Sequence, residues 1–322
     1  SSIGSGSRQE LWTETVERIR RSSSFSGHRS WRLQRFIAKS NDTVLQEQLA
    51  MQIIVEFARM FAAANSQLLL TPYWILAVTN DSGFIEATPD TISIDALKKR
   101  KDFTTLTAFF KDTFGGANGS RFQRARDNFI RSNAAYSIVC YLLQIKDRHN
   151  ANILLAKDGR VVHIDFGFLF NKTVHFEKAP FKLTDDFVEL MNCDGDAPRD
   201  GGGSSSSSSS GGGGAAAVRA AGRRVHTETG FERYCRLCVS GFLTARRSHA
   251  RIIDLINMST RYGRAYPCLE GGTVVDDLRA RLRLELSERQ AAEHVLHLIS
   301  ESRSHWRTAV FDSYQRIVNA IA

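Results

Sequence analysis

Cysteine is scarce in this sequence, with five residues among 322. An odd and sparse set in a chain of this length argues against a disulfide scaffold and for a reducing compartment. Cys235 and Cys238 form a C-x-x-C pair, but no second C-x-x-C or C-x-x-H accompanies it to complete a zinc site. Because the surrounding FERYCRLCVSGFL has the pattern of a buried helix, we predict that both are core residues.

Long apolar runs are also missing. No stretch reaches the roughly 20 residues that a membrane-spanning helix needs. The first residues, SSIGSGSRQELW, contain neither an initiator methionine nor the apolar core of a signal peptide, so we interpret the chain as part of a longer protein. Zinc-finger spacings and interleaved basic and aromatic motifs are absent as well, which argues against a nucleic-acid partner.

The sequence does contain an excess of basic residues within an ordinary globular composition. Lys and Arg number 43 against 34 Asp and Glu, a formal net charge of +9, and 42% of the residues are hydrophobic. The apolar content is sufficient for a sizeable core in one large domain or two lobes. The charge favours an anionic partner, either a phosphorylated ligand or an acidic membrane surface.

The first part of the chain has the pattern of a small mixed lobe, which we assign to residues 11–90 after a flexible lead at 1–10. The segment 45–64 predicts an amphipathic helix, because Leu49, Ile53, Phe57 and Phe61 share one face. A further helix is predicted over 11–21, and strands at 31–39, 68–80 and 83–87.

The second part, residues 91–322, predicts a larger and mainly helical lobe. A helix over 126–145 is apolar on most sides near its end and should be buried. The apolar runs NILLA and RVVHIDF flank Asp158 and Gly159, and a D-G turn between such runs predicts a β-hairpin. The low-complexity run GGGSSSSSSSGGGGAAA predicts a disordered insertion at 197–230. Other helical patterns lie at 185–192, 231–258, 274–284 and 288–322.

The segment 146–167, KDRHNANILLAKDGRVVHIDFG, carries the residues that phosphoryl transfer requires. Asp147 and Asn152 are five residues apart on a loop, the spacing that protein kinases use between catalytic base and asparagine. The hairpin should return Asp165 to the side of Asn152. One neutral and one charged oxygen ligand could then share magnesium and leave positions for water and phosphate.

Each of these residues has an ordinary alternative. Asp147 could cap a turn, Asn152 could be a loop residue, and the triplet Asp-Phe-Gly occurs by chance. Their joint occurrence around a predicted hairpin favours the catalytic interpretation. His149 lies on the same loop, and a neutral imidazole there could accept a hydroxyl proton or orient the aspartate.

A lysine for the nucleotide phosphates is expected in the small lobe. Lys39 ends the strand predicted at 31–39, and Glu47 lies near the start of the following helix. A strand lysine held by a helix carboxylate is the arrangement that kinases use. Taken alone, Lys39 would be assigned to the solvated surface; together with the downstream segment it becomes a candidate ATP contact.

The order D-R-H, in KDRHNANILL followed by VVHIDFG, resembles the phosphoinositide-kinase superfamily rather than protein kinases. The longer stretch AAYSIVCYLLQIKDRHNANILLAKDGRVVHIDFGFLF resembles the type III phosphatidylinositol 4-kinases, and Lys146 before the D-R-H favours these over 3-kinases. FERYC, SGFLTARR and PCLEGG are most similar to the beta form. The resemblance covers nearly the whole chain and implies an α+β, two-lobed protein-kinase-like fold.

The resemblance also implies the nucleotide site. Lys39 would contact the phosphates of ATP and Glu47 would hold it, while Asp147 and His149 would act on the lipid hydroxyl. Asn152 and Asp165 would bind magnesium, or manganese in its place. The adenine pocket would be formed by Tyr73 and by a hinge of Ile85, Glu86, Ala87 and Thr88.

On the substrate side, the resemblance implies transfer of the γ-phosphate of ATP to the 4-hydroxyl of phosphatidylinositol, which gives phosphatidylinositol 4-phosphate. The activation loop at 168–184 would meet the headgroup through Lys172, Lys178 and Lys182, whose scattered charge suits an unphosphorylated lipid. The enzyme would be cytoplasmic and peripheral on internal, Golgi-like membranes, with small regulatory proteins as partners.

Two alternatives remain open at this point. The family's G-D-D-L-R-Q-E reads N-D-T-V-L-Q-E here, so that Thr43 and Leu45 replace an acid and an arginine. This departure is compatible with a pseudokinase or scaffold. A protein Ser/Thr kinase of the related group is the other alternative, although such enzymes usually have G-D-R-H. The last segment, HWRTAVFDSYQRIVNAIA, has an apolar helical face that could lie on a membrane or pack against the lobe.

Overall fold

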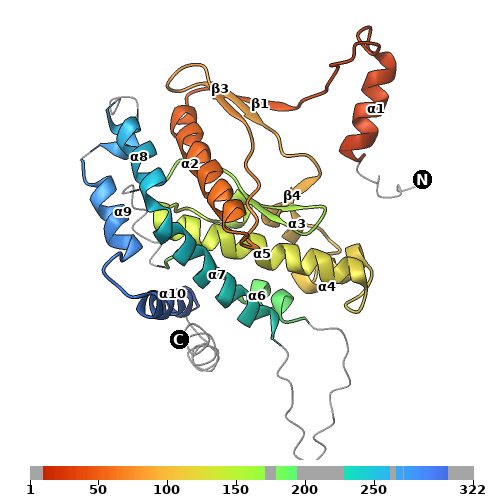
Figure 1. The fold of residues 1–322 in the computed structure, drawn as a ribbon. Helices are drawn as coiled ribbons and strands as arrows, with labels where there is room; N and C mark the ends of the chain where they lie inside the picture. The colour runs from red at the N-terminus through yellow and green to blue at the C-terminus, as the bar shows by residue number, and fades with distance from the viewer. Residues whose placement is uncertain (1–9, 171–178, 194–227, 262–265, 271, 304–322) are drawn as a thin grey trace, which may run out of the picture.

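The computed structural model describes residues 10–170, 179–193, 228–261, 266–270 and 272–303 (Figure 1). The helices are α1 (Trp12–Ser22), α2 (Val44–Ala63), α3 (Ile94–Lys98), α4 (Leu106–Phe114), α5 (Ser120–Leu143), α6 (Asp185–Met191), α7 (Gly230–Arg247), α8 (His249–Thr260), α9 (Val274–Leu282) and α10 (Glu288–Ser302). The strands are β1 (Phe36–Lys39), β2 (Ile75–Ala77), β3 (Gly83–Glu86), β4 (Thr91–Ser93), β5 (Ile153–Ala156) and β6 (Val161–His163).

The first three strands form an antiparallel sheet in the order β1-β3-β2, against which α2 packs (Figure 1). The predicted helix at 45–64 is confirmed as α2, and its four predicted face residues are all buried. The strand predicted at 31–39 is too long, because β3 has only four residues and pairs with 36–39 alone. The register places Ile37, Ile75 and Ile85 on one face of the sheet.

The predicted hairpin is confirmed as β5 and β6, which pair Ile153 with His163. Gly159 in its turn has φ +88°, a backbone conformation that favours glycine. A Cβ at this position would lie 2.3 Å from the carbonyl oxygen of Ala125 in α5, so the turn sits directly against that helix. Strand β4 pairs with the other edge of β5 and completes a second sheet, β4-β5-β6, that was not predicted.

Helix α5 is the centre of the helical part of the molecule. It begins six residues before the predicted start at 126 and is almost fully buried from Phe129 onward. It ends where Gln144 adopts the left-handed conformation, φ +49°. Helix α7 packs along α5 (Figure 1). Cys235 and Cys238 on α7 are fully buried, which confirms them as core residues.

Two helical predictions need correction. The pattern at 231–258 is two helices, α7 and α8, because Ser248 leaves the helical conformation with φ −112° and ψ 17°. Helix α7 begins at Gly230, the last residue of the predicted insertion. Of the pattern at 288–322, α10 accounts for 288–302, and the rest lies outside the described residues, as do 197–227 of the insertion. No helix in the described ranges is both long and apolar enough to cross a bilayer.

A ring cluster joins α10 to the helical core. His294 on α10 lies within 2.9 Å of the Tyr141 hydroxyl and packs beside Phe242 of α7. Partial burial lowers the pKa of His294 below its ordinary value, and the positive charges of Arg283 and His297 lower it further.

The lowered pKa of His294 predicts an acid-sensitive contact. Between its folded and unfolded pKa values, the unfolded chain binds a proton that the folded protein does not, so stability falls as the pH drops below about 6.5. Since His294 is half exposed, we expect a loss of only about 0.5 kcal/mol between about pH 7.5 and 5.5. Urea unfolding at both pH values should show a smaller loss in His294→Gln. The control His28→Gln, at an exposed position, should lose as much stability between the two pH values as the wild type. Equal losses of stability in all three proteins would contradict the assignment of this pH dependence to His294.

Candidate active site

The loop that leads from α5 into β5 carries the D-R-H segment, and the chain leaves β6 through Asp165. Asp147 and Asp165 both have φ +61°, in the left-handed region that non-glycine residues seldom occupy. Such conformations persist only where the surroundings hold them, and they are frequent at functional sites. Both aspartates are therefore in positions that the fold enforces.

The hairpin brings Asn152 and Asp165 together as predicted. The amide of Ile164, next to Asp165, donates to the backbone oxygen of Asn152 at 3.1 Å. The Asn152 side-chain amide donates from Nδ2 to the backbone oxygen of Asp147 at 2.9 Å, which leaves its Oδ1 for another partner. An amide oxygen beside a carboxylate is a donor set that fits magnesium together with water and phosphate oxygens. Within the described ranges, no three His, Cys, Asp or Glu side chains converge as metal ligands.

Arg148, which the sequence analysis left without a role, links the two halves of this site. Its side chain is buried and donates to the backbone oxygens of Lys146, at 3.0 Å, and Ile164, at 2.7 Å. It also donates to the backbone oxygen of Asp165 and lies over the ring of Phe166. Because a buried guanidinium fixes several carbonyls at once, Arg148 sets the position of the Asp165 segment relative to the loop.

His149 and Asp147 are neighbours on the surface of this loop. His149 Nε2 lies 3.8 Å from Asp147 Oδ2, and both side chains are partly exposed. His149 Nδ1 accepts a hydrogen bond from the amide of Ala151 at 3.2 Å. The proton of a neutral His149 is therefore on Nε2, where it faces the carboxylate. This geometry suits a histidine that orients Asp147.

Lys39 meets Glu47 as predicted, with 2.8 Å between Nζ and Oε1, and also contacts Asp42 at 2.9 Å. Partial burial works against the charged lysine, but the hydrogen bonds to Glu47 and Asp42 prevail and raise the pKa of Lys39. Burial raises the pKa of Glu47, an effect that Lys39 opposes. The pair is thus held in a partly desolvated position, in which losing one partner costs more than at the surface.

Gln46 connects the lysine-binding helix to the Asp165 segment. Its Nε2 donates to the backbone oxygens of Phe166, at 3.1 Å, and Gly167, at 2.8 Å, and the side chain is buried. Thus α2 carries both Glu47, which pairs with Lys39, and Gln46, which is hydrogen-bonded to the backbone that follows Asp165.

The residues predicted to line an adenine pocket lie in and around β3. Burial raises the pKa of Tyr73 well above its ordinary value, and the nearby carboxylates of Glu47 and Asp165 raise it further. Ile85 and Glu86 belong to β3, and Ala87 and Thr88 follow it. The amides of Glu86 and Ala87 already donate to backbone oxygens of Trp74 and Arg35.

Ile37 is an accessible apolar residue that the sequence did not single out. It shares the buried face of the sheet with Ile85, yet its side chain is 52% exposed, and it lies two residues before Lys39 on the same strand face.

One of the three predicted activation-loop lysines can be located. Lys182 Nζ donates to Asn150 Oδ1 at 2.7 Å, which brings this segment against the candidate catalytic loop. Lys146 supports the same approach by donating to the backbone oxygen of Ala179 at 3.0 Å. Lys172 and Lys178 lie outside the described residues.

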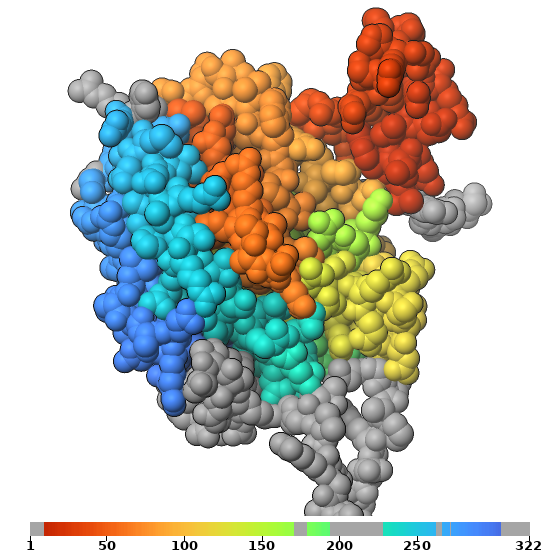
Figure 2. Space-filling view, in the orientation of Figure 1, coloured from red at the N-terminus to blue at the C-terminus, as the bar shows by residue number. Residues whose placement is uncertain are grey.

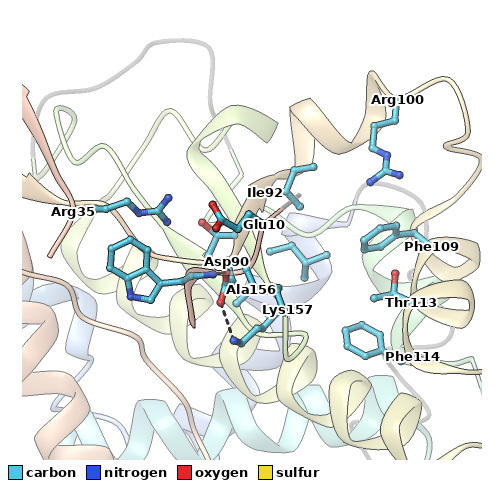
Figure 3. Close-up of a pocket in the computed structure, with 14 residues that line it drawn as sticks. Glu10, Arg35, Asp90, Ile92, Arg100, Phe109, Thr113, Phe114, Ala156 and Lys157 are labelled. Atoms are coloured by element: carbon cyan, nitrogen blue, oxygen red, sulfur yellow. Dashed lines mark hydrogen bonds and ion pairs between the residues drawn. The ribbon is translucent and has the colours of Figure 1, made fainter. Parts of the chain in front are cut away.

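A separate cavity of about 290 Å³ opens between the start of α1 and helix α4 (Figure 3). Asp90 at its base pairs with Lys157 at 2.7 Å and accepts a hydrogen bond from the amide of Trp12 at 2.8 Å. The Arg35 guanidinium lies over the Trp12 ring. The residues that line this cavity do not include Lys39, Asp147, Asn152 or Asp165. We therefore assign the cavity to the attachment of α1 and not to the chemistry.

Comparison with known proteins identifies the family. Residues 33–201 match the family described as phosphatidylinositol 3- and 4-kinase. The chain is 40% identical to "Phosphatidylinositol 4-kinase" of Dictyostelium discoideum, 39% to "Phosphatidylinositol 4-kinase beta 1" of Arabidopsis thaliana and 32% to "Phosphatidylinositol 4-kinase beta" of Danio rerio. Each alignment covers 97% of this chain but 24%, 26% and 34% of the relative, so the chain spans about a quarter to a third of their length. The predicted α+β, two-lobed kinase-like fold is confirmed, and the chain belongs to the phosphatidylinositol 3- and 4-kinase family.

Proposed function

We propose that the protein is a lipid kinase that transfers the γ-phosphate of ATP to the 4-hydroxyl of phosphatidylinositol and so produces phosphatidylinositol 4-phosphate. The observation that carries the proposal is the convergence of Asn152 and Asp165 on the loop of Asp147, with Gln46 linking this segment to the helix that holds Lys39. The similarity to proteins named phosphatidylinositol 4-kinase, over 97% of this chain, supports the choice of lipid and position.

The proposed roles follow from the contacts. Lys39, held by Glu47 and Asp42, would bind the phosphates of ATP. Asn152 Oδ1 and the Asp165 carboxylate would hold magnesium, or manganese in its place, which neutralises charge on the phosphates when bound. Asp147 would accept the proton of the inositol hydroxyl. His149 would keep the Asp147 carboxylate turned toward the substrate through Nε2.

The remaining binding roles are assigned by position. Tyr73 and Ile37, with the hinge Ile85 to Thr88, would enclose the adenine between lobes at 11–90 and 91–322. Lys182 would contact the lipid headgroup together with Lys172 and Lys178. We place the enzyme in the cytoplasm, peripheral on internal, Golgi-like membranes, where small regulatory proteins would recruit it.

The test is incubation of the protein with labelled Mg-ATP, phosphatidylinositol vesicles and a general Ser/Thr protein-kinase substrate, followed by headgroup analysis of the lipid product. We expect label on the 4-position of inositol alone. Label on the 3-position would reassign the regiochemistry. Label on a protein substrate but not on lipid would favour the related Ser/Thr kinases.

The same incubation addresses the scaffold alternative. A folded protein that binds ATP but transfers no phosphate to either substrate would be a pseudokinase. Two contacts beside the altered residues Thr43 and Leu45 support the kinase proposal, because Asp42 contacts Lys39 and Gln46 is hydrogen-bonded to the backbone after Asp165.

A further inference from the structure

The connection between α1 and β1 contains a compact loop, residues 22–32, which we call the Phe25 loop. Three consecutive turns close it, with amides of Ser26, His28 and Trp31 each donating to the backbone oxygen three residues earlier. The Trp31 indole donates to Ser23 Oγ at 3.1 Å and joins the two ends. These bonds give the loop a defined shape, and the surface of residues 10–35 projects from the body of the molecule (Figure 2).

The Phe25 loop presents the most exposed large hydrophobic side chain in the described part of the chain. Phe25 is 73% exposed, and it is the third residue of the turn that the amide of Ser26 closes on the backbone oxygen of Ser23. A phenylalanine that remains in water gains none of the free energy that burial of its ring would give. A partner that covers Phe25 would supply that burial.

The surroundings of Phe25 are cationic. Residues 18–35 contain six arginines and one histidine and no aspartate or glutamate. Arg18 pairs with Glu10 and Arg21 with Glu17. The exposed side chains of Arg29 and Arg32 have no carboxylate partner among the described residues. Their charge is therefore available to an anionic surface.

We propose that the Phe25 loop docks the protein on an anionic phospholipid surface, with Phe25 entering the interface and Arg29 and Arg32 against the headgroups. An exposed apolar side chain on a loop that also carries exposed arginines suits peripheral contact with acidic lipid, since apolar burial and charge attraction both contribute. The choice of a membrane as the partner rests on the proposed function, and the geometry rests on the loop. The sequence did not indicate this surface, because it does not show which of these side chains are exposed.

The experiment is co-sedimentation of the protein with mixed phosphatidylserine–phosphatidylcholine vesicles and with pure phosphatidylcholine vesicles, without ATP. At about fivefold for each cation, we expect Arg29→Gln/Arg32→Gln to weaken binding to the acidic vesicles about 25-fold. Phe25→Ser should weaken it about tenfold. The matched double variant Arg121→Gln/Arg251→Gln removes the same charge from exposed positions on α5 and α8 and should bind as the wild type.

The outcomes separate this inference from the proposed function. Phosphorylation of phosphatidylinositol dispersed in neutral detergent should be unchanged in the loop variants. Wild-type vesicle binding by both loop variants would overturn the inference and leave the kinase assignment standing. Loop-dependent vesicle binding by a protein without lipid kinase activity would support the inference and overturn the proposed function. Tighter loop-dependent binding to a single-stranded RNA oligonucleotide than to acidic vesicles would also overturn it and identify a nucleic-acid surface.

Discussion

Replacement of Asp165 by asparagine is expected to lower the rate of phosphate transfer by about 10³-fold or more while leaving the fold intact. The change preserves the size of the side chain, and the backbone of Asp165 stays bound to Arg148. It removes the one carboxylate of the proposed metal site, next to the neutral amide of Asn152. Electrostatic groups aimed at transferring phosphate contribute on this scale.

The matched control for this prediction is Asp112→Asn, the same chemical change at an exposed position of α4. It should transfer phosphate at the wild-type rate. Steady-state rates with phosphatidylinositol and thermal unfolding midpoints should be measured for all three proteins. An Asp165→Asn protein with an unchanged unfolding midpoint and at least a tenth of the wild-type rate would exclude Asp165 as the metal carboxylate.

The second large effect is expected from Gln46→Met. Methionine fills a similar volume but cannot donate to the oxygens of Phe166, in a buried place, and Gly167, in a partly buried one. A buried carbonyl left without a partner costs about 1–3 kcal/mol, and methionine also removes the buried Gln46 Oε1, which has no hydrogen-bond partner among the described residues, so the free energy of unfolding should fall by about 1–3 kcal/mol. Because the Asp165 segment is then released from α2, we also expect kcat to fall more than the KM for ATP rises.

Gln52 provides the control, since it lies on the same helix but is exposed. Gln52→Met should leave both the free energy of unfolding and kcat within experimental error of the wild type. Urea unfolding and initial-rate kinetics give the two readouts. If Gln46→Met lost stability but kept its kcat, Gln46 would be a packing residue with no effect on the position of Asp165.

The elements with a strong periodic signal could be predicted from the sequence. Helix α2 has a clear apolar face, and the β5–β6 hairpin has a D-G turn between apolar runs. Strand β4 and helices α3 and α4 were not predicted. In the case of β4, three residues are too few to establish a period, and the pairing with β5 is set by tertiary contact. The break between α7 and α8 was also missed, since the apolar spacing continues across Ser248 while the backbone does not.

In the site, the residues with charged partners at recognisable spacing could be predicted. Lys39 and Glu47 do form an ion pair, and the residue before Asp165 is hydrogen-bonded to the backbone of Asn152. Gln46 and Arg148 could not be assigned, because they act on backbone carbonyls, which every residue type carries and no sequence pattern marks. The left-handed conformations of Asp147 and Asp165 were likewise invisible, since aspartate occupies many turns without such a role.

The short link between the two sheets has a mechanical consequence. Only residues 87–90 separate β3 from β4, and four residues reach at most about 14 Å. Pro89 has a fixed φ, and Asp90 is pinned by Lys157 and by the amide of Trp12. The link therefore limits how far the two sheets can separate. In the proposed enzyme, nucleotide exchange would then have to proceed without a wide separation of the sheets.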